Sequence, residues 1–212
     1  MSPAFQESLK VQIPFFIGLG ISIMLPYSWG SALAIFFFLL IVFSVYFFRD
    51  PQRSMSSDEN IIVSPADGKI VNVDEVDSPC GLGKRKRIAI FLSVFDVHVN
   101  RMPTTGTVEI IEYHPGKFLD VRDPQASLLN EHTNWKIQTP HGPLVVRQIA
   151  GLVARRIVPW APVGKNVSRG ELIGMIRFGS RTEIFLPLDC EILVKEGDYA
   201  HGISTSLAKW KV

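Results

Sequence analysis

The chain has 212 residues, 47% of them hydrophobic, and a formal net charge of +2. So small a charge argues against a nucleic-acid-binding protein, which would carry a strongly basic surface. Its two cysteines, Cys80 and Cys190, form no CxxC pair, so neither a zinc site nor a disulfide framework is predicted, and a reducing compartment fits.

The N-terminal region contains no charged residue from Ile13 to Phe48. One helix of that length would far exceed a hydrocarbon core about 30 Å thick. Because the segment 26–30 (Pro-Tyr-Ser-Trp-Gly) interrupts it, we expect a membrane helical hairpin. The second arm, from about Ser31 to Phe48, is long enough to span, and the shorter first arm is either tilted or re-entrant. A cleaved signal peptide ending near Ala34 is the alternative, but a longer apolar run follows that site.

Basic residues flank the hairpin on both sides: Lys10 before it, and Arg49 and Arg53 after it. Since basic flanks stay in the cytoplasm, both ends of the hairpin are expected on the cytoplasmic side of the cell membrane. The predicted organisation is a membrane-anchoring hairpin over residues 1–53 and a β-rich catalytic domain over residues 54–212, which begins with a polar linker.

The domain after the linker is predicted to be mainly β, because short apolar runs alternate with turns rich in Gly, Pro and Asp. The expected strands lie at residues 61–64, 68–73, 87–94, 106–114, 135–139, 144–150, 157–159, 172–178, 181–186 and 190–194. The strand rhythm near the C-terminus resembles that of biotinyl/lipoyl hybrid barrels. We therefore expect a compact β-sandwich or hybrid barrel, in which a hairpin carries Gly179-Ser180 where a carrier domain has its lysine.

Gly179 and Ser180 interrupt an apolar run between Met175 and Pro187. One interpretation is a strand kink beside a solvated serine. The other is chemical: Ser180 Oγ attacks the carbonyl of Gly179, which has no Cβ to block a strained backbone. β-Elimination of the resulting ester would break the chain and leave a pyruvoyl group at position 180. Such a ketone forms a Schiff base with an amine, as pyridoxal phosphate does, without a free cofactor.

Two further polar motifs are candidates for chemistry. Asp67 lies in Ser-Pro-Ala-Asp-Gly, which suits a β-turn but also places a carboxylate at a strand end, where it can orient a proton carrier or a substrate amine. In Phe-Asp-Val-His-Val-Asn-Arg-Met-Pro, alternation puts Asp96, His98 and Asn100 on one face if the strand continues. That face is either a solvated edge or a site where His98 acts as acid or base.

The remaining polar clusters favour surface positions. Four histidines are expected on the surface, with spacings that fit no metal signature, so no metal is predicted: His114, His132, His141 and His201. The basic run from Lys84 to Arg87 is expected to be a solvated loop, with contact to anionic lipid headgroups as the alternative.

Five motifs, in this order along the chain, resemble those of phosphatidylserine decarboxylases: residues 63–70, 95–103, 113–118, 130–132 and 178–180. Phe-Phe-Arg-Asp-Pro at residues 47–51 is similar to the end of the membrane segment in the short prokaryotic form of that family. The resemblance implies a proenzyme that cuts itself between Gly179 and Ser180. The products would be a β chain, 1–179, and an α chain, 180–212, that starts with a pyruvoyl group made from Ser180.

The resemblance also implies the reaction: decarboxylation of a phospholipid with a serine headgroup to the ethanolamine lipid and CO2. The two chains would stay together as a heterodimer in the membrane, with further oligomerisation left open. The catalytic residues would be Ser180, Gly179, His98 and Asp67. Long-chain members have a second histidine, part of a self-cleavage triad, where this sequence has Arg101. The base for cleavage therefore stays open between Asp67, acting through water, and another histidine.

Three alternatives remain. An archaetidylserine-type lipid with ether chains would use the same chemistry. A serine hydrolase would carry Gly-x-Ser-x-Gly, which the residues around Ser180 do not match. A non-enzymatic, membrane-anchored hybrid-barrel binding module would keep its chain uncut.

Overall fold

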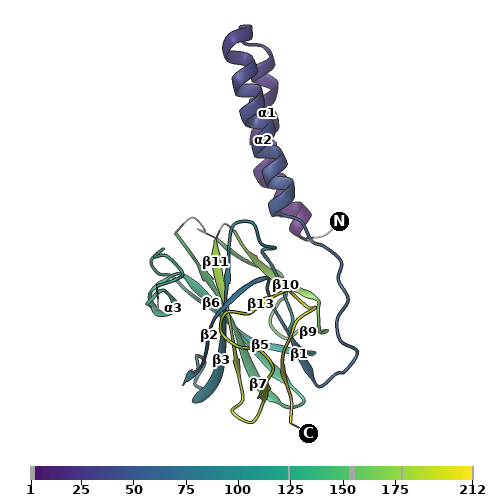
Figure 1. Ribbon diagram of the computed structural model, residues 1–212, viewed down its shortest axis with the longest axis vertical. Coiled ribbons are helices and arrows are strands. Elements are labelled where there is room, and N and C mark those ends of the chain that lie inside the picture. The colour runs from purple at the N-terminus through teal and green to yellow at the C-terminus, as the bar shows by residue number, and fades with distance from the viewer. Residues whose placement is uncertain (1–2, 124, 153–155, 178, 212) are drawn as a thin grey trace. The chain divides into compact units, whose positions relative to one another are not determined.

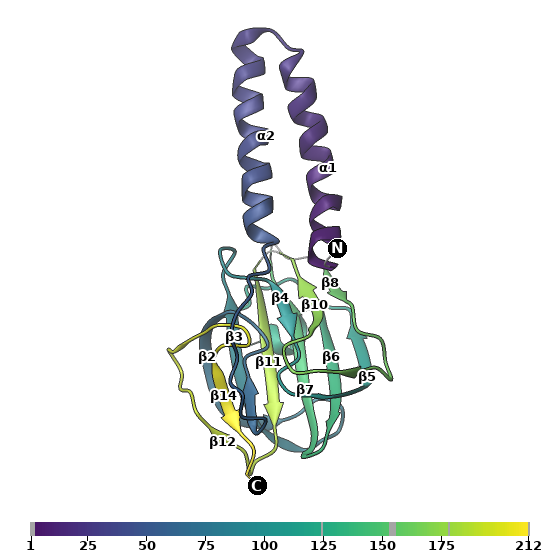
Figure 2. The ribbon, with the colours of Figure 1, turned by 90° about the vertical axis from the view of Figure 1, so that its right-hand side faces the viewer.

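A computed structural model describes residues 3–123, 125–152, 156–177 and 179–211. The chain divides into two compact units, Met1–Pro51 and Gln52–Val212, and each is described by itself. In the first unit, α1 (Pro3–Ile23) and α2 (Tyr27–Phe47) lie side by side as an antiparallel hairpin (Figures 1 and 2). Of the helices in the described part of the chain, α2 is long and apolar enough to cross a membrane.

Both arms of the hairpin are longer than the sequence predicted. Residues 27–30 belong to α2 and not to the break, because the break ends at Pro26, which lacks the N–H that a helix continuing from α1 would need. The first arm begins at Pro3, upstream of the uncharged stretch, and its polar turn holds an ion pair between Lys10 and Glu7 (2.5 Å).

The strands of the second unit form one large and two small antiparallel sheets within the described residues. The large sheet has the order β13 (Tyr199–Ala200), β2 (Gly68–Asp77), β3 (Lys84–Leu92), β11 (Ser180–Leu186), β7 (Gly142–Ala150), β6 (His132–Thr139), β5 (Gly106–His114), β9 (Asn166–Val167). One small sheet has the order β1 (Ile61–Val63), β14 (Ser206–Lys209), β12 (Glu191–Ile192). The other has the order β4 (Val99–Arg101), β10 (Leu172–Ile176), β8 (Ile157–Pro159). Figure 2 shows β3, β11, β7 and β6 next to one another.

The main hydrophobic core lies between these sheets. Alternate residues of the central strands, such as Ile90 of β3 and Ile184 of β11, are fully buried in it. The small sheets contribute Ile62, Ile173 and Leu207 to the same cluster. Packed sheets with a shared core form a sandwich, so the predicted mainly-β sandwich or hybrid barrel, preceded by a helical hairpin, is confirmed.

The strand pairing contradicts two local predictions. Gly179-Ser180 does not lie at a hairpin tip, because β10 pairs with β4 and β8 whereas β11 pairs with β3 and β7. The pair instead lies where the chain passes from one sheet to another. The basic run Lys84–Arg87 is not a loop but the start of β3, where it faces the acidic residues of β2. Opposite charges on paired strands favour that pairing.

The sequence favours short turns near Asp123 to Asn130, and the short helix α3 (Ala126–Leu129) lies there. Four short strands were not predicted: β4, β9, β13 and β14. Each has only two to four residues, too few for a hydrophobic period to be visible in the sequence.

A buried ionic cluster covers the other face of β11. The carboxylate of Glu183 lies 2.7 Å from the Arg181 guanidinium and 3.5 Å from that of Arg87, and it accepts a hydrogen bond from the Ser127 hydroxyl (2.9 Å). Burial lowers the pKa of Arg181, and the negative charge of Glu183 opposes that shift. The cluster thus holds the strand that begins with Ser180 against its neighbours.

We expect Glu183→Gln to destabilise the domain by about 3–5 kcal/mol, because it leaves the buried Arg181 charge uncompensated. For a chain of this size the thermal midpoint of the detergent-solubilised protein should fall by roughly 6–20 °C. Glu109→Gln is the control, since Glu109 pairs with Lys136 (3.1 Å) at a half-exposed position and should change stability by less than about 1 kcal/mol. Equal midpoints for the two variants would show that the cluster contributes no stability.

Candidate active site at the start of strand β11

Ser180 is the first residue of β11, at the centre of the large sheet. It pairs in register with Leu92 of β3 and Ala150 of β7 and is fully buried, so the alternative interpretation of a solvated serine is wrong. Its hydroxyl Oγ has no hydrogen-bond partner in the described structure. A buried hydroxyl without a partner costs about 1–3 kcal/mol, so its presence points to a chemical role.

The backbone before Ser180 adopts a conformation that requires glycine. Gly179 has φ +68°, in the left-handed region that glycine enters without steric cost. Its carbonyl oxygen also lies against the backbone of Gly151, where an added Cβ would be only 2.5 Å away. The carbonyl that Ser180 would attack is therefore confined by the chain just after β7.

His98 lies beside this link and is fully buried. Its Nδ1 is 2.9 Å from the carbonyl oxygen of Asp96, and its Nε2 is 3.3 Å from the backbone nitrogen of Gly179. Because a backbone N–H can only donate, Nε2 must be the acceptor, and the hydrogen-bond network assigns the proton to Nδ1. The Nε2 lone pair of the neutral ring thus faces the Gly179-Ser180 link.

The three polar residues of the His98 motif do not share a strand face as predicted. β3 ends at Leu92, and Asp96 lies in the following turn, where its carboxylate accepts from the Ser93 N–H (2.7 Å) and from the Tyr199 hydroxyl. The strand does not continue because this turn intervenes before β4. Since His98 and Asn100 are fully buried, the alternative of a solvated edge is also wrong.

Asn100 belongs to a buried chain of amide hydrogen bonds. Its Nδ2 donates to Thr182 Oγ1 (3.2 Å), and its Oδ1 accepts from Gln148 Nε2 (2.6 Å). The indole N–H of Trp135 donates to Gln148 Oε1 (2.8 Å). This network joins the segment that carries His98 to the strand that begins with Ser180. Sequence reasoning missed Thr182 and Gln148, although each lies on the strand face that otherwise points into the core, as Ile184 and Val146 do.

We expect Asn100→Leu to slow chain cleavage by up to about 100-fold, because Gln148 and Thr182 lose a buried partner and β4 no longer holds His98 against Gly179. Pulse labelling followed by denaturing gel electrophoresis would give the rate. Gln138→Leu, at an exposed position of β6, is the matched control and should cleave normally. If a folded Asn100→Leu protein cleaved at the wild-type rate, Asn100 would have no role in positioning His98.

Asp67 occupies a different environment. Directly before β2, its carboxylate accepts two hydrogen bonds from the Arg53 guanidinium, one of them at 2.7 Å, and a third from the Gly202 N–H (2.7 Å). None of these described contacts involves Gly179 or Ser180. Arg101, at the position of the family's second histidine, donates from Nη1 to the Gly170 carbonyl (2.5 Å).

Three of the four histidines predicted at the surface are exposed, and the fourth, His132, is only partly so. His132 is half-buried on β6 and stacks on His114 with ring centroids 4.7 Å apart, and burial lowers the pKa of His132. Burial also raises the pKa of Cys80 and Cys190 to about 11, so both thiols stay protonated at neutral pH. Among the residues whose structure is described, no group of three or more His, Cys, Asp or Glu side chains could hold a metal ion.

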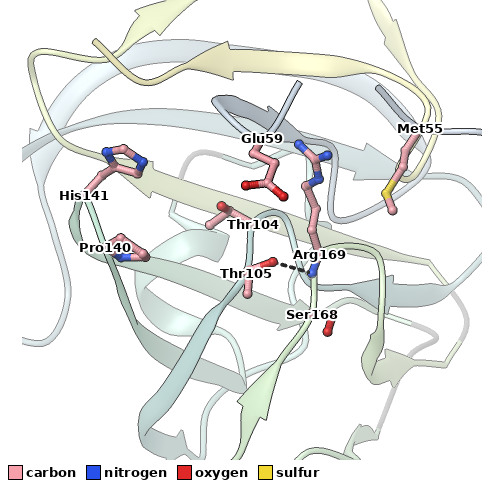
Figure 3. Close-up of a pocket in the computed structure, with 8 residues that line it drawn as sticks. All are labelled: Met55, Glu59, Thr104, Thr105, Pro140, His141, Ser168 and Arg169. Atoms are coloured by element: carbon pink, nitrogen blue, oxygen red, sulfur yellow. Dashed lines mark hydrogen bonds between the residues drawn. The ribbon is translucent and has the colours of Figure 1, made fainter. Parts of the chain in front are cut away.

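A pocket of about 380 Å³ lies elsewhere in the domain (Figure 3). Its lining residues include Glu59, Thr105, His141 and Arg169 but neither Ser180 nor His98. The Arg169 guanidinium donates to the carbonyls of Asp58 (2.5 Å) and Ile61 (3.0 Å). These hydrogen bonds fix the end of the linker to the domain. We therefore assign this pocket no part in the chemistry.

Comparison with known proteins gives a consistent result. A family model described as phosphatidylserine decarboxylase matches residues 40–206. The phosphatidylserine decarboxylase proenzyme of Citrifermentans bemidjiense is 49% identical over 165 residues, which are 77% of this chain and 75% of that protein. The proenzyme of Carboxydothermus hydrogenoformans is 42% identical over 199 residues, 93% of each chain. On this coverage and identity, the chain belongs to the phosphatidylserine decarboxylase family.

Proposed function

We propose that this chain is a self-processing, pyruvoyl-dependent decarboxylase that converts phosphatidylserine to phosphatidylethanolamine and CO2. The observation that carries the proposal is the buried, unpartnered hydroxyl of Ser180, next to a left-handed glycine and beside the Nε2 of His98. The proenzyme names of the relatives support processing, and their substrate supports the reaction.

Self-cleavage begins when Ser180 Oγ adds to the carbonyl carbon of Gly179. The C–N bond breaks, the nitrogen takes a proton, and an ester joins the two residues. Removal of the Ser180 Cα proton then expels the Gly179 carboxylate and leaves dehydroalanine. Its hydrolysis releases ammonia and leaves a ketone at position 180. The fragments 1–179 and 180–212 remain associated because β11 pairs with β3 and β7 on both sides.

His98 is the base in this proposal, because its Nε2 contacts the amide of Gly179 and carries no proton. His98 would thus take the role of the base, since this chain has Arg101 in place of the family's second histidine. Asp67 acts indirectly: with Arg53 it holds the turn whose Pro65 carbonyl accepts from the Arg101 N–H (2.9 Å). The Asp67 carboxylate thus positions the segment that carries His98. It would affect the reaction only through that segment.

The pyruvoyl group would form a Schiff base with the substrate amine and take up the electron pair that CO2 leaves behind. The site fits such a group, since position 180 is shielded from solvent and the neighbouring His98 Nε2 can hold a proton. His98 then delivers that proton to the substrate carbon. The substrate is a membrane lipid, and α2 supplies an anchor of spanning length. The catalytic domain lies on the cytoplasmic side of the cell membrane, as the flanking Lys10 and Arg49 favour.

The test uses purified full-length protein and phosphatidylserine labelled in its serine carboxyl group. We expect labelled CO2, and we expect reduction with cyanoborohydride to attach the substrate to the 180–212 fragment. A parallel assay with an ether-linked serine lipid distinguishes the archaetidylserine-type alternative. A cleaved protein that releases no CO2 from either lipid would refute the proposed decarboxylase activity. An uncut, folded chain would instead favour the binding module.

A further inference from the structure

We infer that the backbone N–H of Gly151 stabilises the negative charge that develops on the Gly179 carbonyl oxygen during self-cleavage, and that the Asn130 side chain holds this N–H in place. The inference rests on the proposed function, because the charge forms when Ser180 Oγ bonds to the Gly179 carbonyl carbon. It gives a role to the motif at residues 130–132, which the mechanism above does not use.

Gly151 is buried directly after β7 and lies against the carbonyl group of Gly179. A Cβ atom built on Gly151 would be 2.5 Å from the Gly179 oxygen and 3.4 Å from its carbonyl carbon. The first distance is shorter than a Cβ atom can approach a backbone oxygen, so the contact needs glycine at position 151. The Gly151 backbone therefore borders the oxygen on which the charge develops.

The hydrogen bonds of Ala150 show where the Gly151 N–H points. The Ala150 carbonyl accepts from Asn130 Nδ2 (2.9 Å), and the Ala150 N–H donates to the Glu131 carbonyl (2.9 Å). Both groups thus face the β6 side of β7, whereas β11 lies on the other side. In a planar trans peptide, the C=O of one residue and the N–H of the next point in opposite directions. The Gly151 N–H therefore points to the β11 side, where Gly179 lies.

The side chain of Asn130 is itself fixed by buried hydrogen bonds. Asn130 is 1% exposed, its Oδ1 accepts from the Leu119 N–H (2.9 Å), and its Nδ2 donates a second proton to the Leu119 carbonyl (2.9 Å). Rotation of this amide would leave buried donors without acceptors, so its orientation is fixed. Asn130 thus fixes the Ala150 carbonyl and, through the rigid peptide, the Gly151 N–H.

This arrangement has the features of an oxyanion hole. When Ser180 Oγ bonds to the Gly179 carbon, the C=O double bond becomes single, and its oxygen carries the charge until the C–N bond breaks. A backbone N–H aimed at that oxygen in a buried site stabilises the charge and keeps its own proton. His98 Nε2 contacts the nitrogen of Gly179 (3.3 Å), so the base and the N–H donor act at different atoms of one residue.

The role of the Gly151 N–H should end with self-cleavage. Once the chain is cut, the Gly179 carbonyl belongs to a free carboxylate and is no longer bonded to position 180. We therefore expect changes at Gly151 and Asn130 to slow cleavage and to leave decarboxylation by the processed enzyme unchanged.

The direct test removes the Gly151 N–H and keeps the shape of the chain. Cell-free translation of the full-length chain in lipid nanodiscs can place glycolic acid at position 151, where an ester oxygen then replaces the N–H. We expect cleavage to slow by about 10²–10³-fold, the usual effect of losing one oxyanion donor. Glycolic acid in place of Gly81, an exposed residue of the turn between β2 and β3, is the matched control and should leave the rate unchanged.

A second variant tests the positioning role of the amide. Asn130→Leu should slow cleavage by roughly 10–100-fold, because the Ala150 carbonyl loses its donor, while kcat per pyruvoyl group stays at the wild-type value. Asn134→Leu is the control: Asn134 is 2% exposed on β6, and its Oδ1 accepts from Arg147 Nε (2.8 Å). It also loses a buried hydrogen bond, but away from Gly179, and should cleave at the wild-type rate.

The outcomes separate this inference from the proposed function. Wild-type cleavage by the chain with glycolic acid at position 151 would overturn the inference while the proposed function stands. Equal losses of cleavage rate and kcat per pyruvoyl group in Asn130→Leu would also overturn it, because they would show a general structural role. If the wild-type chain stayed uncut in the same assay, the proposed function itself would fail.

Discussion

Replacing Ser180 with alanine is expected to leave a single uncut chain and to abolish decarboxylation. The variant lacks the hydroxyl that we propose attacks Gly179, so no ketone would form at position 180. It should nevertheless fold, because the lost hydroxyl makes no hydrogen bond in the described structure. Removing an unsatisfied buried polar group is neutral or stabilising, so the thermal midpoint should stay the same or rise.

This combination of outcomes distinguishes chemistry from folding. Ser204→Ala is a suitable control, because its hydroxyl donates to the Ser54 carbonyl (2.9 Å) at an exposed position and should not affect cleavage. Denaturing electrophoresis, CO2 release and thermal unfolding of both variants complete the comparison. A folded Ser180→Ala protein that still releases CO2 would refute the pyruvoyl mechanism.

His98→Ala is expected to slow both chain cleavage and decarboxylation, each by about 10²–10⁴-fold, the usual contribution of a general acid or base. The physical reason is the position of its Nε2, 3.3 Å from the Gly179 nitrogen. Cleavage is measured as the rate at which the small fragment appears. Decarboxylation is measured as kcat per pyruvoyl group, so that unprocessed chain does not count as inactive enzyme.

His141→Ala is the matched control for His98. His141 stacks on Trp210 with ring centroids 5.0 Å apart, and its loss should leave both rates unchanged. If His98→Ala cleaved slowly but kept the full rate per pyruvoyl group, His98 would serve self-processing alone. If His98→Ala left the rates of both cleavage and decarboxylation unchanged, His98 would contribute only to packing.

The sequence indicated which residues lie together at position 180 better than it indicated their surroundings. Motifs identified Gly179, Ser180 and His98, and the structure brings these three together. The burial of Ser180 could not be predicted, because it depends on β3 and β7, whose residues are far away in the sequence. For the same reason the hairpin prediction failed: the partners of β10 and β11 are fixed by distant strands and not by the short connection between them.

The polar network around Asn100 illustrates a second limit. Gln148 and Trp135 lie on neighbouring strands, and nothing in their local sequence indicates that the Gln148 side chain links Trp135 to Asn100. Asp67 illustrates the opposite case, since its motif identified the strand end correctly but could not reveal the partner Arg53 in the linker. Local pattern therefore predicted the elements, while contacts across the sandwich decided the environment of each polar group.

The central claim is that the chain cuts itself at one bond and makes its own ketone. Intact mass spectrometry of the purified protein under denaturing conditions tests it most directly. The account predicts two chains, 1–179 and 180–212, the smaller with a pyruvoyl group in place of an N-terminal serine. A single chain of full mass from folded protein, or a small chain that still begins with serine, would contradict it.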